Sequence, residues 1–282
     1  MNPPRRIALQ THHRVDDTRE TVRKLLDAVQ EAGGEILVRQ DEADKHGLDG
    51  GKIVVDPAAE GVDAVVALGG DGTMLSALRE FAGTGAPVFS FNFGAVGFLA
   101  TTEPDEVDDG IRRLIEGDFE TLELPTLVIE PAAGPRLAVN DIAFLRRSGS
   151  RVAQLGYAVR GDEIARARCD GLVVSTPVGS TGYNLANGGP VVAWGVEGYI
   201  VSYIAPHTLT ARTLVAAKPD VLVVTNLGEE QVDVETDGKR VCTLEPGQEI
   251  EVQFDDHPAL LAKVSGTGFY DQLIEKFGRL AG

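Results

Sequence analysis

The residues best suited to chemistry form a glycine-rich run, Gly69-Gly70-Asp71-Gly72-Thr73, which follows an apolar stretch. Glycines around one acid let a backbone pass close to a bulky anion, and their N–H groups can line a phosphate. In open α/β sheets, ligands bind beyond the carboxyl ends of strands, where this run is expected to lie. The alternative is a tight turn with Asp71 as a helix N-cap, but a cap needs one short polar side chain and not three glycines. The run lacks the Walker lysine, so it is not a P-loop.

A second group of hydroxyls, glycines and one aromatic ring follows Asp170 and is centred on Ser180, Thr181 and Tyr183. Such a loop could hold a nucleotide through backbone hydrogen bonds, hydroxyl contacts and stacking on the Tyr183 ring. Taken alone, it could equally be a polar turn, because turns are built from these residue types.

Three histidines near these runs each have two interpretations. His12 and His13 follow the first expected strand, and they could face a ligand or belong to an exposed polar turn. His207, after Pro206, could bind a phosphate or carry a proton, but a lone histidine in this setting is more often structural.

The elements that position the glycine-rich run alternate between strand and helix. Apolar runs and helical spacing predict a parallel sheet with covering helices, and therefore an α/β domain over residues 1–120. The expected strands cover 7–9, 35–39, 63–68 and 87–91; the expected helices cover 17–32, 74–81 and 104–117, with a loop or short helix over 41–52.

From residue 121 to 265, short strands separated by turn residues predict a second, all-β domain. Asp237-Gly238 is expected to form a hairpin turn. Apolar residues at helical spacing predict that 266–282 ends in a helix packing back on the first domain. The expected strands cover 126–130, 136–140, 142–146, 154–160, 171–175, 199–204, 220–225, 231–235 and 249–253.

Composition limits the class of partner. The chain of 282 residues carries a formal charge of −17, which argues against a surface for nucleic acid or anionic lipid. Cys169 and Cys242 lie far apart without metal-ligand spacing, so neither a zinc site nor a disulfide framework is predicted. No apolar stretch is long enough for a signal peptide or a membrane span, so a cytoplasmic protein that contacts no membrane is expected.

Four ordered motifs resemble the NAD kinase family. They are the G-G-D-G-T run, N-x-G-x-x-G-F-L from Asn92 to Leu99, the pair Asn140-Asp141, and T-P-x-G-S-T-x-Y ending at Tyr183. Four motifs in order are far more specific than one glycine pattern. The resemblance implies an N-terminal α/β domain, a C-terminal β-sandwich that binds NAD, and a final helix that returns to the first domain.

Residue roles follow from the same resemblance. Asp71 would be the catalytic base, with Gly72 beside the phosphate, and Asn140 and Asp141 would hold the dinucleotide. At position 141 the family more often has Glu, so the ribose contacts could shift by a methylene. The full set of binding residues implied comprises Gly70, Gly72, Thr73, Asn92, Phe98, Asn140, Asp141, Arg168, Asp170, Ser180, Thr181, Gly182, Tyr183 and Asp237.

The resemblance implies a kinase that phosphorylates the 2′-hydroxyl of the adenosine ribose of NAD to give NADP, with ATP or polyphosphate as donor. Mg²⁺ or another divalent metal would neutralise the donor, held largely by phosphates and water, since no dedicated protein metal cage is visible. A homodimer or homotetramer is also implied, because Asp170 and Tyr183 would lie near a subunit contact.

Two other functions are compatible with part of this pattern. Diacylglycerol and sphingosine kinases share the G-G-D-G-T turn, but a lipid kinase should present a basic or apolar membrane-facing surface, and this chain is strongly acidic. A non-catalytic NAD(P)-binding regulator would have no need of a base at Asp71.

Overall fold

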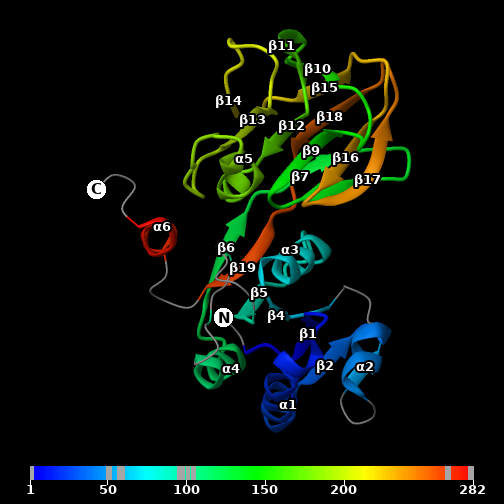
Figure 1. Cartoon of the computed structure of the whole chain (residues 1–282). Coiled ribbons are helices and arrows are strands. Elements are labelled where there is room, and N and C mark those ends of the chain that lie inside the picture. Colours follow the sequence, from blue (N-terminus) through cyan, green and yellow to red (C-terminus); the bar gives the residue numbers. More distant parts are fainter. Residues whose placement is uncertain are drawn as a thin grey trace. The chain divides into compact units, whose positions relative to one another are not determined.

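The chain folds into two compact units in a computed structural model that describes residues 3–48, 53–55, 61–93, 99, 102, 106–263 and 268–278. The α/β unit comprises Met1–Glu123 with Ala259–Gly282, and the β unit comprises Leu124–Pro258. Figure 1 shows α1 to α4 in the first unit and the antiparallel strands, together with the short helix α5 (Tyr183–Ala186), in the second.

A seven-stranded sheet forms the centre of the α/β unit, in the order β3-β2-β1-β4-β5-β19-β6. From β3 to β19 the neighbouring strands pair in parallel, as the sequence predicts. The strands are β1 Arg6–Thr11, β2 Glu35–Val38, β3 Ile53–Val55, β4 Ala64–Gly69, β5 Val88–Asn92, β6 Glu120–Leu124 and β19 Ala259–Lys263.

Helices cover both faces of this sheet, so its central strands are continuously apolar. Every residue of β4 and β5 is buried. Helices α1 and α4 lie on one face and α3 on the other (Figure 1). The helices of this unit are α1 Val15–Glu31, α2 Gln40–His46, α3 Asp71–Glu80, α4 Val107–Glu116 and α6 Phe269–Phe277.

Strand β19 enters this sheet from the far end of the chain. Leu261 of β19 pairs with Val88 of β5. The residue pattern places 259–263 at the end of the all-β domain, because the pairing of segments so far apart leaves no local signal. The edge strand β3 and the strand β6 also lie outside the predicted set.

The β unit consists of two six-stranded antiparallel sheets. One has the order β11-β10-β15-β18-β7-β8, with β7 Leu127–Ile129, β8 Arg136–Ala138, β10 Ala153–Val159, β11 Asp162–Cys169, β15 Leu222–Asn226 and β18 Glu249–Phe254. The other has the order β14-β13-β12-β9-β16-β17, with β9 Asp141–Arg146, β12 Gly171–Ser175, β13 Gly198–Ile204, β14 Leu214–Ala217, β16 Val232–Thr236 and β17 Lys239–Leu244. The predicted sandwich is therefore confirmed.

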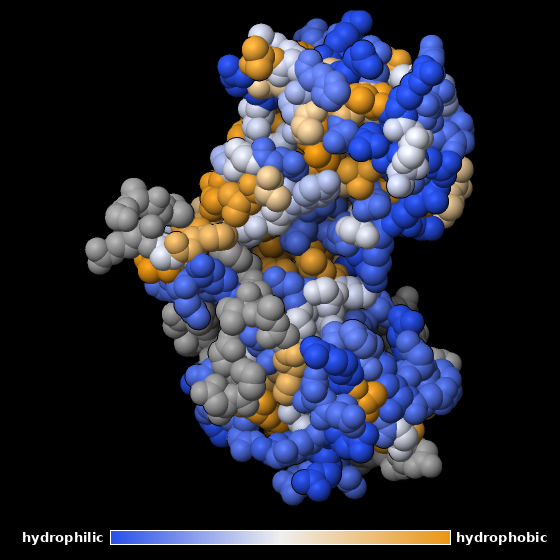
Figure 2. Space-filling model, in the orientation of Figure 1, coloured by the Kyte–Doolittle hydropathy of each residue, from blue (hydrophilic) through white to orange (hydrophobic). Residues whose placement is uncertain are grey.

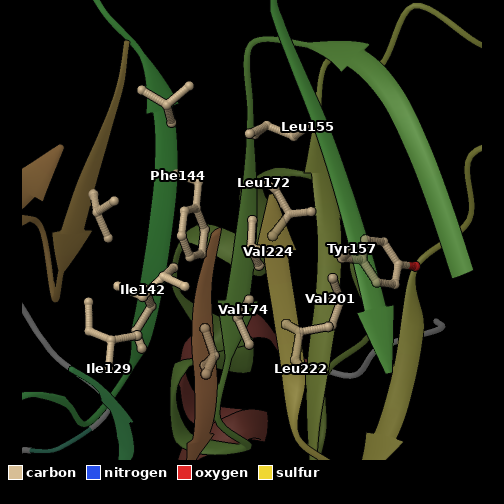
Figure 3. Packing of buried hydrophobic residues seen from close by; sticks show 14 of the residues in the cluster. Ile129, Ile142, Phe144, Leu155, Tyr157, Leu172, Val174, Val201, Leu222 and Val224 are labelled. Atoms are coloured by element: carbon tan, nitrogen blue, oxygen red, sulfur yellow. The ribbon is translucent and has the colours of Figure 1, made fainter. Parts of the chain in front are cut away.

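The core of the β unit is built from the inner faces of both sheets. Figure 3 shows Phe144 and Leu172 of one sheet together with Leu155 and Val224 of the other, and all four are fully buried. Alternate residues of each strand point inward, as sandwich packing requires. The pattern misses β11 because this edge strand is mostly exposed and charged, which hides the alternation of apolar residues.

Hydrophilic residues cover most of the face shown in Figure 2, in keeping with the formal charge of −17. Among the helices that the structure describes, none is long and apolar enough to cross a membrane.

We expect Phe144→Ala to lower the free energy of unfolding of the β unit by about 3–5 kcal/mol, because it leaves a cavity between the two sheets. Urea denaturation followed by circular dichroism measures the loss. Ile164→Ala is the matched control: Ile164 is 47% exposed, so its truncation should cost less than about 1 kcal/mol. Equal losses for the two variants would contradict this description of the core.

Candidate functional site

The carboxyl ends of β1 and β4 lie side by side where the strand order of the sheet reverses. Strand β1 pairs with β2 on one side and with β4 on the other. In doubly wound sheets such a switch point is where ligands bind. The turn after β1 contains His12, and the turn after β4 contains the glycine-rich run.

The glycine-rich run connects β4 directly to α3. Gly70 is the N-cap of α3, with extended backbone angles, and Asp71 is the first residue of the helix. The alternative in which Asp71 caps the helix is therefore wrong, and the helix begins three residues before the predicted start at 74. Asp71 lies at the positive end of the helix dipole. A side chain on Gly72 would meet nothing within 4 Å, which leaves room for a ligand to approach the backbone.

Gly69 and Asn92 join the ends of β4 and β5. The N–H of Phe93 donates to the Gly69 carbonyl at 3.1 Å. A Cβ on Gly69 would lie 2.4 Å from Thr73 Oγ1, so only glycine lets the first turn of α3 approach β4 this closely. Asn92 is buried, and its N–H donates to the Thr102 carbonyl at 2.9 Å. Phe98, the other residue predicted in this loop, lies outside the described residues.

In the β unit, the carboxylate of Asp237 holds the turn that contains Asn140 and Asp141. Its oxygens accept hydrogen bonds from the N–H groups of Val139 at 3.1 Å, Asn140 at 2.8 Å and Asp141 at 3.3 Å. Asp237 adopts a positive φ of 47°, and Gly238 follows at 71°, which fits the predicted hairpin turn. Asp237 therefore fixes the backbone of the Asn140-Asp141 pair.

The same pair is held from its other side by the segment that follows β12. The N–H of Thr176 donates to the Asn140 carbonyl at 2.9 Å. A Cβ on Gly179 would lie 2.1 Å from the Asn140 carbonyl oxygen, so this close approach requires glycine. The backbone of Gly182 lies nearby, since a Cβ there would be 3.9 Å from both Asn140 Nδ2 and Asp141 Oδ2.

The carboxyl group of Asp141 is almost completely buried. Burial raises its pKa to about 7, and the negative charges of Asp237 and Glu235 add to the shift. Glu235 is absent from the predicted site. It lies on β16, which ends at Thr236, one residue before the hairpin turn at Asp237. Its place near Asp141 depends on the register between β16 and β9, in which Thr236 pairs with Ile142, so no local spacing identifies it.

The predicted residues of the hydroxyl-rich loop differ in how accessible they are to a ligand. Ser180 is fully buried, and its hydroxyl donates to the Pro177 carbonyl at 2.6 Å and accepts from the Val192 N–H at 3.0 Å, so it holds the loop together. Thr181 donates to the Val178 carbonyl at 3.2 Å. Tyr183, the first residue of helix α5 (Tyr183–Ala186), is 38% exposed and is available to a ligand.

The carboxylates of Asp141, Asp170 and Glu235 influence the hydroxyl of Tyr183. Burial raises the pKa of its hydroxyl, and Glu235, Asp141 and Asp170 raise it further. The structure therefore brings Asn140, Asp141, Gly182, Tyr183 and Asp237 into one polar cluster in the β unit.

Arg168 and Asp170 lie at the end of β11, beside a cavity of about 310 Å³ that Arg146, Arg151 and Arg168 help to line. Asp170 accepts a hydrogen bond from Arg146 Nε at 2.5 Å. Arg146 is a further member of the site that the sequence does not reveal, because its position depends on the register between β9 and β12.

Across the described residues, no group of three His, Cys, Asp or Glu side chains is placed to hold a metal ion.

Comparison with known proteins identifies one family for both units. Residues 7–119 match the ATP-NAD kinase N-terminal domain, and residues 139–264 match the ATP-NAD kinase C-terminal domain. The NAD kinase of Gemmatimonas aurantiaca is 36% identical over 226 residues, which cover 77% of this chain and 78% of that protein. The NAD kinase of Natranaerobius thermophilus is 29% identical over 278 residues, covering 96% of this chain and 97% of that protein.

Two solved structures share the architecture. An NAD kinase from Archaeoglobus fulgidus in complex with ATP superposes with a TM-score of 0.75 at 27% identity, and the match covers 97% of each chain. Yeast NADH kinase complexed with NADH superposes with a TM-score of 0.89 at 21% identity, covering 100% of this chain and 90% of that one. At 21% identity the second likeness concerns the fold alone.

The buried carboxyl of Asp141 should make stability depend on pH. Its pKa is about 7 in the folded chain, against about 3.9 when unfolded, so the folded state binds the proton more tightly. The resulting stabilisation is complete below about pH 4 and is lost as the pH rises through 7.

We therefore expect the unfolding free energy of the wild type, minus that of Asp141→Asn, to fall between pH 4 and 7 by a few kcal/mol and then to level off. Urea titrations at several pH values measure this difference, in which the titration of groups not coupled to Asp141 cancels. Parallel pH curves for the two proteins would contradict the assignment.

Proposed function

Because the chain belongs to the ATP-NAD kinase family, we propose that it transfers the terminal phosphoryl group of ATP to the 2′-hydroxyl of the adenosine ribose of NAD, giving NADP and ADP. The observation that carries this proposal is the match of both family domains, in order, over residues 7–119 and 139–264. The lipid-kinase alternative finds no support in these matches. Incubation with NAD, ATP and Mg²⁺, followed by mass spectrometry for NADP, tests the activity directly.

For the chemical step, we propose Asp71 as the general base. Phosphoryl transfer mainly requires alignment of the attacking oxygen and neutralisation of charge. The carboxylate of Asp71 would accept the proton of the 2′-hydroxyl while that oxygen bonds to the γ-phosphorus and the bond to ADP breaks. Its place as the first residue of α3 supports this role, since the exposed backbone at Gly72 and the positive helix end favour bound phosphate.

For the acceptor, we propose that the polar cluster of the β unit binds NAD. Asn140 Oδ1 is buried without a hydrogen-bond partner among the described residues, and a bound hydroxyl could supply one. The half-exposed ring of Tyr183 offers a stacking surface for a base. Thr181, Asp170 and Arg168 are proposed to complete the nucleotide contacts, whereas Asp237 would act by holding Asn140 and Asp141 in place.

A divalent ion, Mg²⁺ by proposal, supplies charge neutralisation on the donor phosphates when bound. Since the described residues contain no three-ligand metal group, the phosphates and water would provide most of its ligands. We further propose a cytoplasmic homodimer or homotetramer, in which Asp170 and the exposed Tyr183 lie near a subunit contact. Light scattering tests the assembly, and polyphosphate in place of ATP tests the range of donors.

Replacing the proposed base should affect turnover far more than binding. We expect Asp71→Asn to lower kcat by about 10²-fold or more, the usual scale of general-base catalysis, while calorimetric binding of NAD is retained. Folding should also be retained, because Gly70 and not Asp71 caps the helix. A variant with near-normal turnover would remove Asp71 from the catalytic role.

Chelation should stop the reaction. We expect EDTA to abolish NADP formation and added Mg²⁺ or Mn²⁺ to restore it, because the acidic chain cannot neutralise the donor phosphates alone. Full activity in metal-free buffer would show that the protein itself supplies this charge.

A further inference from the structure

His12 lies in the turn after β1, beside the glycine-rich run. Its N–H donates to the Leu68 carbonyl at 2.8 Å, so it continues the pairing of β1 with β4. Its Cβ would be 3.3 Å from a Cβ built on Gly69, which places the base of the imidazole against the start of the run. The two turns therefore flank the switch point of the sheet together.

The residue before His12 is fixed by helix α2. The carboxylate of Glu42, which is buried, accepts from the Thr11 N–H at 3.1 Å and from the Thr11 hydroxyl at 2.7 Å. Lys45 Nζ donates to Glu42 at 2.8 Å and to the Thr11 carbonyl at 3.2 Å. This network holds the end of β1 in one conformation, so His12 is presented from a rigid position.

The hydrogen bonds also define which nitrogen of His12 carries the proton. The N–H of Arg14 donates to His12 Nδ1 at 3.2 Å, so Nδ1 is the acceptor. A neutral ring with Nδ1 as acceptor carries its proton on Nε2. Burial lowers the pKa of His12, and the nearby His13, Arg14 and Lys45 lower it further against the opposing effect of Asp17, so the ring is neutral at pH 7.

We propose that His12 is a donor-binding residue whose Nε2–H donates a hydrogen bond to a phosphate oxygen of the phosphoryl donor. The basic side chains at this turn are ion-paired, Arg14 with Asp17 at 3.2 Å and Lys45 with Glu42 at 2.8 Å, so the proposal rests on the Nε2–H group of His12 and its place beside the glycine-rich run, and not on a local positive charge. The inference rests on the proposed function, because it names a second contact for the donor at the same site.

The test measures binding of Mg²⁺-ATP and of Mg²⁺-tripolyphosphate, which lacks the nucleoside, by calorimetry. In His12→Asn, the amide side chain keeps an acceptor near the position of Nδ1 for the Arg14 N–H, but it has no donor at the position of Nε2. In His12→Gln, the longer side chain returns a donor to the position of Nε2. We expect His12→Ala and His12→Asn to weaken both ligands by about 10- to 100-fold, as for loss of a hydrogen bond to a charged group. His12→Gln should recover most of the affinity.

In steady-state assays, His12→Ala and His12→Asn should raise KM for ATP and leave KM for NAD unchanged. The control variant His257→Ala, at an exposed histidine of the β unit, should behave as wild type. Unchanged affinity for both phosphate ligands in His12→Asn would overturn the inference. So would equal losses in His12→Asn and His12→Gln, or equal losses in His12→Ala and His257→Ala. Wild-type protein that binds ATP but makes no NADP would instead refute the proposed function and leave this binding test intact.

Discussion

The reversal of strand order between β1 and β4 is the constraint on which the α/β unit depends. Because β1 pairs in parallel with both β2 and β4, the turns after β1 and β4 emerge at the same edge of the sheet. That edge collects the start of α3, the exposed backbone of Gly72 and the rigidly held His12. Residues separated by more than fifty positions in the chain thus become neighbours.

The β unit relies on a different device, a partly buried carboxylate whose partners are backbone N–H groups. Asp237 accepts hydrogen bonds from three of them, which offsets the cost of removing its charge from water. Asp141, next to it, lacks that compensation, so burial and like charges keep its proton on near neutral pH. Two aspartates in one cluster therefore behave differently: one organises the backbone, and the other is a carboxyl group that titrates near neutral pH.

Local patterns in the sequence predict most of the fold, because strands and helices of the α/β unit bury regular apolar faces. The glycine-rich run and the Asn140-Asp141 pair are picked out as candidate site residues by a different signal, the types of residue and their spacing. What the sequence does not reveal depends on distant pairing. Arg146 meets Asp170 only through strand register, and the inward turn of the Ser180 hydroxyl follows from backbone geometry.

The position of β19 has a consequence for the order in which the protein can form. In the sheet order, β19 lies between β5 and β6. Strands β5 and β6 precede the β unit in the chain, whereas β19, at residues 259–263, follows it. On the ribosome, β5 and β6 are made first, and the place between them stays unfilled until the chain is almost complete. The β unit, whose strands all lie between residues 127 and 254, can fold earlier from neighbouring segments. The unit that begins the chain is therefore the last to finish its sheet, and a nascent chain cut short before residue 259 would expose an unpaired edge of β5.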